Sequence, residues 1–180
     1  NIPETIESFR QCIELCTELG IKFIIHKGDW FNNRIGQPLS VLNTTCKKIK
    51  KMLREAGIIL ISFPGNHDKT DLNSIESYLD VFDDNKHFFV IDEESDITHF
   101  FKSDFPELDI QLAVLPYFNE EDEYHRQIPV LRATHNYQKK VILFTHIATN
   151  SVRNNDGGLV DNNVTLDLFK GFHSVNVGHY

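Results

Sequence analysis

The chain has 180 residues, of which 41% are hydrophobic and 24% are charged, and its formal net charge at pH 7 is −8. This is enough apolar material for one well-packed domain, so a single domain over residues 1–180 is predicted. The excess of acidic residues argues against a protein that coats nucleic acid through many Lys and Arg contacts. It does not exclude a nuclease, because bound metal ions can supply positive charge locally.

Cysteine usage and hydropathy indicate where the protein works. Cys12, Cys16 and Cys46 are odd in number and lie in helical patterns, which indicates a reducing compartment. No apolar stretch approaches the roughly 20 residues that a membrane span requires, and no signal-peptide pattern opens the chain. We therefore expect a cytoplasmic protein without a membrane partner.

Hydrophobic periodicity predicts alternating helices and strands in the first half of the chain. Apolar residues at helical spacing stop at Gly20, and a second helical stripe stops at Gly57. The predicted elements are a helix ending at residue 20, a strand at 21–25, a helix at 38–56, a strand at 58–61 and a helix near 74–82.

The second half continues this alternation with more strands. Three strands are predicted at 87–91, 96–101 and 109–115, and their close spacing suggests an antiparallel or mixed stretch. A mostly exposed helix at 120–136 and strands at 140–144 and 174–177 follow. The alternation favours an α/β domain with much parallel pairing. The segment 148–163, rich in Asn, Asp and Gly, is predicted as a loop of functional length.

Four short polar motifs each follow an apolar run. They are Gly28-Asp29-Trp30-Phe31, Gly65-Asn66-His67-Asp68, Thr145-His146 and Gly178-His179. In an α/β sheet, the carboxyl ends of strands gather polar groups into one crevice. A carboxylate, an amide and three imidazoles are therefore expected to meet there, a set that suits a two-metal phosphoesterase.

The chemistry of phosphodiester hydrolysis suggests a role for each of these residues. Two divalent ions about 3.5–4 Å apart can generate hydroxide and offset the charge on the phosphoryl oxygens if one carboxylate bridges them. Asp29 is the candidate bridge, Asn66 offers an amide oxygen, and His146 and His179 offer imidazole nitrogens. Mixed oxygen and nitrogen ligands fit manganese, iron or zinc better than calcium.

His67 is predicted to be catalytic rather than a ligand, because neighbours in a turn cannot easily bind the same ion as Asn66 does. It would stabilise the transition state or protonate the leaving oxygen. Asp68 is predicted to assist by orienting and charging the His67 imidazole.

The order of these motifs resembles the calcineurin-like metallophosphoesterase superfamily over nearly all 180 residues. The resemblance implies a layered sandwich of mixed β-sheets flanked by helices. It implies that Asp29 bridges the metals, that Asn66 and His146 bind the second metal, and that His67 is the catalytic histidine. His179 corresponds to the first histidine of the family's closing Gly-His-x-His.

Within the superfamily, Gly28-Asp29-Trp30-Phe31 and Leu115-Pro116-Tyr117 are most similar to the SbcD-type branch of DNA-repair nucleases. This likeness implies a manganese-dependent exonuclease or endonuclease that acts on DNA with an SMC-like ATPase subunit. It leaves a homodimer open.

Two family features are not found between Asn1 and Tyr180. The family opens with Asp-x-His on a first strand, and its closing motif ends on a histidine one position past Tyr180. We therefore expect a domain that is incomplete at both ends, missing its first strand and its C-terminal continuation. Such a fragment is predicted to bind the first metal poorly or not at all.

Two alternatives remain open at this point. The same site could serve a phosphatase or phosphodiesterase that acts on phosphoproteins or small nucleotides. A non-catalytic scaffold with a lost metal site is the other alternative. The scaffold is disfavoured because all five site residues are present, namely Asp29, Asn66, His67, His146 and His179.

Overall fold

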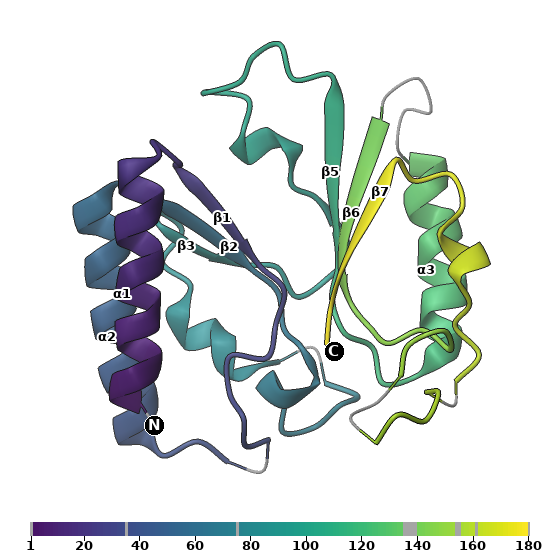
Figure 1. Ribbon diagram of the computed structural model, residues 1–180, viewed down its shortest axis with the longest axis horizontal. Coiled ribbons are helices and arrows are strands. Elements are labelled where there is room, and N and C mark those ends of the chain that lie inside the picture. Colours follow the sequence, from purple (N-terminus) through teal and green to yellow (C-terminus); the bar gives the residue numbers. More distant parts are fainter. Residues whose placement is uncertain are drawn as a thin grey trace.

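The computed structural model describes residues 2–34, 36–74, 76–134, 140–153, 156–160 and 162–179. Within these ranges the chain forms three α-helices and two β-sheets, which confirms the predicted α/β class (Figure 1). None of the described helices combines the length and apolar character that a membrane crossing needs. Asn1 and Tyr180, which bound the predicted domain, lie outside the described residues.

The first sheet is entirely parallel and is covered by two helices. Its strands are β1 (Phe23–His26), β2 (Ile59–Ser62) and β3 (Phe88–Val90), in that spatial order. Helices α1 (Ile2–Glu18) and α2 (Leu39–Ala56) lie side by side on its outer face (Figure 1). Gly57 ends α2 in the left-handed conformation, with φ +65°, which explains why the helical pattern stops there.

The second sheet is mixed. Its spatial order is β4 (Ser95–Asp96), β5 (Ile110–Leu115), β6 (Lys140–His146) and β7 (Ser174–Gly178). Only β4 runs antiparallel to its neighbour, while β5, β6 and β7 are parallel. Helix α3 (Glu121–Thr134) covers the outer face of this sheet (Figure 1).

Hydrophobic clusters join these layers. One cluster packs α1 and α2 against the first sheet, a second packs α3 against the second sheet, and a third lies between the sheets. Because Tyr124, Ile128 and Leu131 of α3 are buried in the second cluster, this helix is less exposed than its sequence suggested. Between the sheets, Ile61 and Phe63 belong to the same cluster as Val114.

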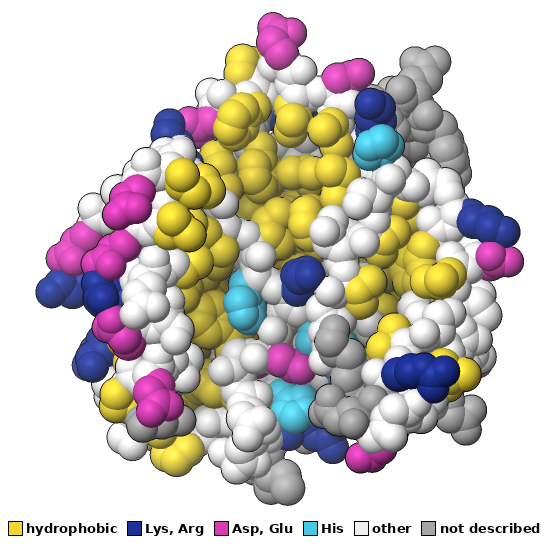
Figure 2. All heavy atoms as spheres, viewed as in Figure 1, with side chains coloured by type: hydrophobic (Ala, Val, Ile, Leu, Met, Phe, Trp, Pro, Cys, Tyr) yellow, Lys and Arg dark blue, Asp and Glu magenta, His cyan; other side chains and the backbone are white. Residues whose placement is uncertain are grey.

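The space between the two sheets is only partly filled. Figure 2 shows hydrophobic side chains gathered in a hollow between the sheets, with histidine and acidic side chains lower in the same cleft. A cavity of about 450 Å³ at one end of the hollow is lined by Phe23, Phe101 and Phe105. Phe105 remains 52% exposed there.

Two predicted elements differ from the structure. Of the helix predicted near 74–82, the described residues form only a short 3-10 helix at Tyr78–Phe82, where the Ser77 hydroxyl accepts the Leu79 amide. The predicted strand at 96–101 ends after Asp96, whose carboxylate accepts the Thr98 amide at 2.8 Å and turns the chain. In both places a side chain bonds the local backbone and competes with regular structure.

The segment 148–163, predicted as a functional loop, is described except for residues 154–155 and 161. Its described part folds against the start of α3, where the Asn163 amide donates to the Glu121 carboxylate at 2.8 Å. The His125 ring lies 3.1 Å from the Asn163 side-chain oxygen. These contacts attach the loop to the second sheet's own helix.

Candidate metal centre

The four motifs meet at one end of the two sheets. Asp29 lies in the loop after β1, and Asn66 begins a 3-10 turn at Asn66–Asp68 after β2. His146 is the last residue of β6, and His179 directly follows β7. The structure therefore brings together side chains that the sequence separates by up to 150 positions.

The His146 imidazole is the centre of this group. Its Nε2 atom lies 2.9 Å from Nδ1 of His179, 3.2 Å from the Asn66 side-chain oxygen and 3.4 Å from an Asp29 carboxylate oxygen. One ring nitrogen and two oxygens thus surround Nε2. A proton on either ring nitrogen, or a bound metal ion, would satisfy this arrangement.

The other ring nitrogen of His146 fixes the tautomer. Nδ1 lies 2.6 Å from the Lys27 carbonyl oxygen, and because a carbonyl can only accept, Nδ1 carries the proton. In neutral imidazole this leaves a lone pair on Nε2, facing Asp29, Asn66 and His179. A backbone carbonyl on the far nitrogen is the usual means of orienting a histidine that binds metal.

The donor atoms fit a transition-metal ion. Ligating atoms of Asp29, His146 and His179 all lie within 4.8 Å of one another, and the Asn66 oxygen joins them. With metal–ligand bonds of about 2.0–2.2 Å, neighbouring ligands are separated by roughly 2.8–3.6 Å from octahedral to tetrahedral geometry. The distances of 2.9, 3.2 and 3.4 Å from Nε2 of His146 fall in this range. The mixed nitrogen and oxygen set suits manganese, iron or zinc.

Glycines from three of the motifs make this close approach possible. A Cβ atom on Gly28 would lie 2.8 Å from Nδ1 of His146, and one on Gly65 would lie 2.6 Å from Cε1 of the same ring. A Cβ atom on Gly178 would collide with the Lys27 carbonyl. Any larger residue at these three positions would therefore clash with the His146 ring or with the Lys27 carbonyl that holds it.

Two of the predicted ligands have strained backbones. Asp29 has φ +59° and His179 has φ +104°, in the region that residues other than glycine rarely adopt. Each such residue costs on the order of 1–3 kcal/mol, and such strain concentrates at functional sites. The surrounding contacts hold both side chains toward the centre despite this cost.

Asp68 has a role beyond the predicted one. Its side chain is fully buried and accepts the backbone amides of Asp29, Trp30 and Gly65 at 2.7, 2.8 and 2.9 Å. It thereby ties the loop after β1 to the turn after β2. Among the described residues these backbone amides are the hydrogen-bond partners of the Asp68 carboxylate, so its predicted orientation of the His67 ring stays a prediction.

The His67 imidazole is instead held by a backbone group. Its Nδ1 lies 2.9 Å from the Asn32 carbonyl oxygen, and its backbone amide donates to the Asp29 carboxylate at 3.1 Å. The ring is half-buried, so it remains accessible beside the predicted ligands. The separate catalytic role of His67 stays a prediction.

Burial and neighbouring groups shift the pKa values at the centre. Burial acts to raise the pKa of Asp29, but contacts with the His146 ring and the His67 amide lower it overall. Burial raises the pKa of Asp68 to about 6, against the effect of its amide donors. Burial and the nearby His146 lower the pKa of His179, which favours the neutral, ligating form of that ring.

Two tyrosines support the centre, and the sequence analysis did not assign either to the site. The buried Tyr124 hydroxyl donates to the His146 carbonyl oxygen at 3.1 Å and accepts the Phe118 amide at 2.8 Å. The Tyr117 ring lies 6.1 Å from the His146 ring and 6.5 Å from the His179 ring. Helical spacing could have indicated that Tyr124 is buried, but not which groups its hydroxyl joins.

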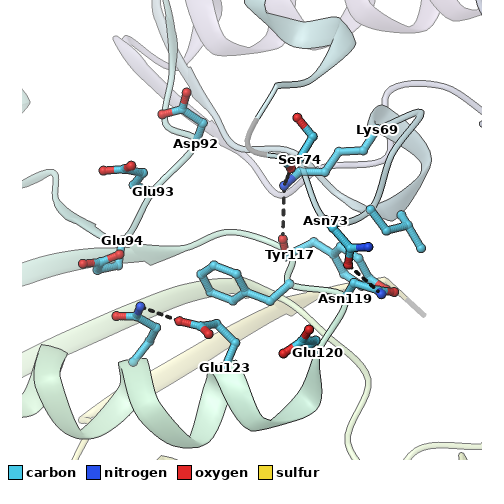
Figure 3. A pocket seen from close by; sticks show the side chains of 13 residues that line it. Lys69, Asn73, Ser74, Asp92, Glu93, Glu94, Tyr117, Asn119, Glu120 and Glu123 are labelled. Carbon is cyan, nitrogen blue, oxygen red and sulfur yellow. Dashed lines mark hydrogen bonds between the residues drawn. The ribbon is translucent and has the colours of Figure 1, made fainter.

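An acidic cavity of about 500 Å³ adjoins the centre at Tyr117. Figure 3 shows five carboxylates around it, from the turn after β3 and from the start of α3. They are Asp92, Glu93, Glu94, Glu120 and Glu123. Lys69, which is buried, also lines the cavity and donates to the Ser74 carbonyl at 2.9 Å. With five carboxylates against one lysine, the lining is negative overall.

Comparisons with known proteins do not assign this chain to a family. A scan against protein-family models finds no match, and a search of curated proteins finds no significant one.

Proposed function

We propose that this protein is a metal-dependent phosphoesterase of the calcineurin-like superfamily. The observation that carries the proposal is the convergence of Asp29, Asn66 and His179 on one nitrogen of His146, with the other nitrogen bonded to the Lys27 carbonyl. Bound divalent ions, manganese by preference, would activate water near neutral pH and offset charge on the phosphoryl group. A bridging role for Asp29 is part of the proposal.

The chain's own residues would divide the remaining tasks. His67 stands beside the ligand group and would protonate the leaving oxygen or stabilise the developing charge. Asp68 would keep Asp29 in position by binding the backbone of both loops. The Lys27 carbonyl would keep His146 in the tautomer that a metal requires.

The arrangement of the sheets also supports a place in this superfamily. The superfamily's sandwich has a further strand that carries Asp-x-His, and β1 offers an open edge beside the hydrophobic hollow (Figure 2). All four residues of β1 are partly exposed, although parallel strands are normally buried on both faces. We propose that this edge is where such a strand pairs.

DNA is the proposed substrate, in a manganese-dependent nuclease subunit that works with an SMC-like ATPase. The motif Gly28-Asp29-Trp30-Phe31 and the Tyr117 segment favour this branch. A phosphodiesterase for small nucleotides is the second candidate, because the carboxylates beside Tyr117 would repel a long phosphate backbone. The scaffold alternative has less support, since the donor atoms are in place.

Hydrolysis assays of the full polypeptide test this proposal. Linear duplex DNA and bis-p-nitrophenyl phosphate would be incubated with the protein in Mn²⁺ and in chelator. We expect hydrolysis in Mn²⁺ alone, a loss of about 100-fold or more in His67→Ala, and normal rates in His99→Ala. His99 is an exposed histidine away from the centre and serves as the matched control.

The outcomes separate the candidates. Cleavage of DNA supports the nuclease, whereas turnover of the small ester alone favours the nucleotide phosphodiesterase. Equal activity in His67→Ala and His99→Ala would contradict the role of His67. Absence of any Mn²⁺-dependent turnover would leave the scaffold as the better account.

A further inference from the structure

Tyr117 belongs to the second sheet but is held in place by the first. It closely follows β5, yet its amide donates to the Pro64 carbonyl at 3.2 Å, two residues before Asn66. Its carbonyl accepts from Nζ of Lys69 at 3.5 Å, directly after the turn that Asn66 begins. Tyr117 is therefore fixed against the turn that carries a predicted ligand and the predicted catalytic histidine.

The Tyr117 ring lies beside the imidazoles of the centre. Its centroid is 6.1 Å from that of the His146 ring, which it meets edge to face. It is 6.5 Å from the centroid of the His179 ring, whose plane is inclined to it by 28°. Because the two imidazoles are 4.8 Å apart, the phenol ring forms the third corner of a triangle with two predicted metal ligands.

The Tyr117 hydroxyl is a donor that the described part of the protein does not use. Among the described residues, the hydrogen bonds of Tyr117 are made by its backbone atoms. The Tyr124 hydroxyl, by contrast, both donates to a carbonyl and accepts an amide. The Tyr117 side chain is half-buried, and a hydroxyl in such a place is satisfied by water or by a bound ligand.

The charges around this hydroxyl suit a donor to an anion. Burial raises the pKa of Tyr117, the Arg34 guanidinium acts against burial, and Asp29 adds to the rise, so that the pKa is raised overall. The phenol therefore keeps its proton near neutral pH. A neutral donor accompanied by a cation favours an anionic ligand.

We propose that Tyr117 is a further catalytic residue, whose hydroxyl donates a hydrogen bond to an oxygen of the phosphoryl group bound at the centre. The inference rests on the proposed phosphoesterase function and adds a residue to that site. Charge is spread over the phosphoryl oxygens in the transition state, so a donor aimed at one of them stabilises it. Since Pro64 and Lys69 hold Tyr117 before any substrate binds, the donor needs little reorganisation.

Tyr117→Phe tests the hydroxyl and keeps the ring. Turnover of bis-p-nitrophenyl phosphate by the full polypeptide would be measured in Mn²⁺, and calorimetry would give the binding of Mn²⁺ and of orthovanadate, which mimics the phosphoryl group during transfer. We expect kcat to fall about 10–100-fold, KM to stay within about threefold, and orthovanadate to bind at least about tenfold more weakly. Mn²⁺ affinity should stay within about twofold, because no ligand is changed.

Tyr78→Phe is the matched control. The Tyr78 hydroxyl also has no hydrogen-bond partner among the described residues, but its ring packs against the hydrophobic cluster beneath α1 and α2. Its kcat and orthovanadate affinity should stay within about twofold of wild type. Tyr117→Leu removes the ring as well, and a role in packing alone predicts weaker Mn²⁺ binding in this variant together with wild-type behaviour of Tyr117→Phe.

Wild-type kcat and orthovanadate affinity in Tyr117→Phe would overturn the inference, as would an equal loss in Tyr78→Phe. Because orthovanadate binding is read without turnover, a protein that binds it through the Tyr117 hydroxyl and hydrolyses nothing would count against the proposed function alone. Mn²⁺-dependent hydrolysis that is equal in wild type and Tyr117→Phe would count against this inference alone. A wild type that neither binds orthovanadate nor hydrolyses the ester would overturn both.

Discussion

The two sheets contribute to the candidate metal centre in different ways. The first sheet supplies Asp29, Asn66 and His67 from loops, and the Asp68 carboxylate binds those loops together through three backbone amides of the same half. The second sheet supplies His146 from the end of β6 and His179 from just past the end of β7.

The residues that the second sheet supplies (the second half of the centre) depend for their orientation on those that the first sheet supplies (the first half). The His146 ring is bonded to the Lys27 carbonyl, which belongs to the loop after β1, and Lys27 also donates its Nζ to the Val177 carbonyl of β7 at 2.8 Å. The first half is therefore stabilised locally, whereas the second is positioned across the interface between sheets. Changes at the interface should affect metal binding most, and changes within either half should affect it less.

Gly65→Ala should have the largest effect, because the new Cβ atom would collide with the Asp29 carboxylate and the His146 ring at the same time. We expect Mn²⁺ affinity to fall at least about 100-fold and the free energy of unfolding to fall by about 1–3 kcal/mol. Isothermal titration calorimetry with Mn²⁺ and urea unfolding would measure the two effects.

Gly36→Ala is the control for this change, because a Cβ atom at Gly36 has open space around it. It should leave Mn²⁺ affinity unchanged within about twofold and stability within about 0.5 kcal/mol. If Gly65→Ala behaved in the same way, the two halves would not be in the close contact described here.

Asp68→Asn should disrupt the first half alone. An asparagine brings its own N–H donors toward three backbone donors, so we expect a loss of about 2–3 kcal/mol in the free energy of unfolding near pH 4. Chelator would be present throughout, so that metal binding does not contribute. Urea unfolding of both proteins at several pH values would give the difference.

The difference should become smaller as the pH rises. Burial raises the pKa of folded Asp68 to about 6 from an ordinary 3.8, so between these values the folded state holds a proton that the unfolded state has lost. Wild-type stability from this group is thus full below about pH 4 and declines by about 3 kcal/mol as the pH passes 6. A difference that grew with pH would mean that the amide donors outweigh burial.

Tyr124→Phe should have the smallest effect, confined to the second half. Loss of the hydroxyl leaves the His146 carbonyl and the Phe118 amide without this partner, which should cost about 1–2 kcal/mol of unfolding free energy. We expect Mn²⁺ affinity to fall by roughly tenfold, because His146 is no longer fixed through its backbone. Thermal unfolding and calorimetry would measure both quantities.

Tyr78→Phe is the matched control for Tyr124→Phe. The Tyr78 hydroxyl is buried and has no hydrogen-bond partner among the described residues. Its removal should be neutral or slightly stabilising, within about 0.5 kcal/mol. A similar loss in both variants would show that the Tyr124 hydroxyl does nothing beyond filling space.

The sequence was sufficient to predict most of the long elements. Strong periodicity located the helices that became Ile2–Glu18 and Leu39–Ala56, and apolar runs located both strands that carry the His146 and His179 motifs. It failed at 74–82 and at 96–101, where Ser77 and Asp96 bond the nearby backbone. Such local side-chain bonds leave little trace in a hydrophobic pattern.

The grouping of Asp29, Asn66, His146 and His179 could also be predicted from sequence, because each motif follows a strand and the parallel strands end at the same edge. The backbone groups that hold each of these side chains could not be predicted from sequence. The Lys27 carbonyl lies 119 positions from His146, and any residue type has such a carbonyl. The backbone partners of Asp68 could not be predicted either, because they come from a loop that is distant in sequence and from a turn amide, and any residue type has such amides.

The sequence by itself thus determined the α/β class, the main strands and helices, and the donor atoms available at their ends, since these follow from periodicity and from the chemistry of each residue. Only the tertiary structure decided the tautomer of His146, the anchoring role of Asp68, and the acidic cavity that adjoins the centre at Tyr117. Those properties arise from distances between distant segments and from the burial of charge, neither of which exists until the two sheets pack together.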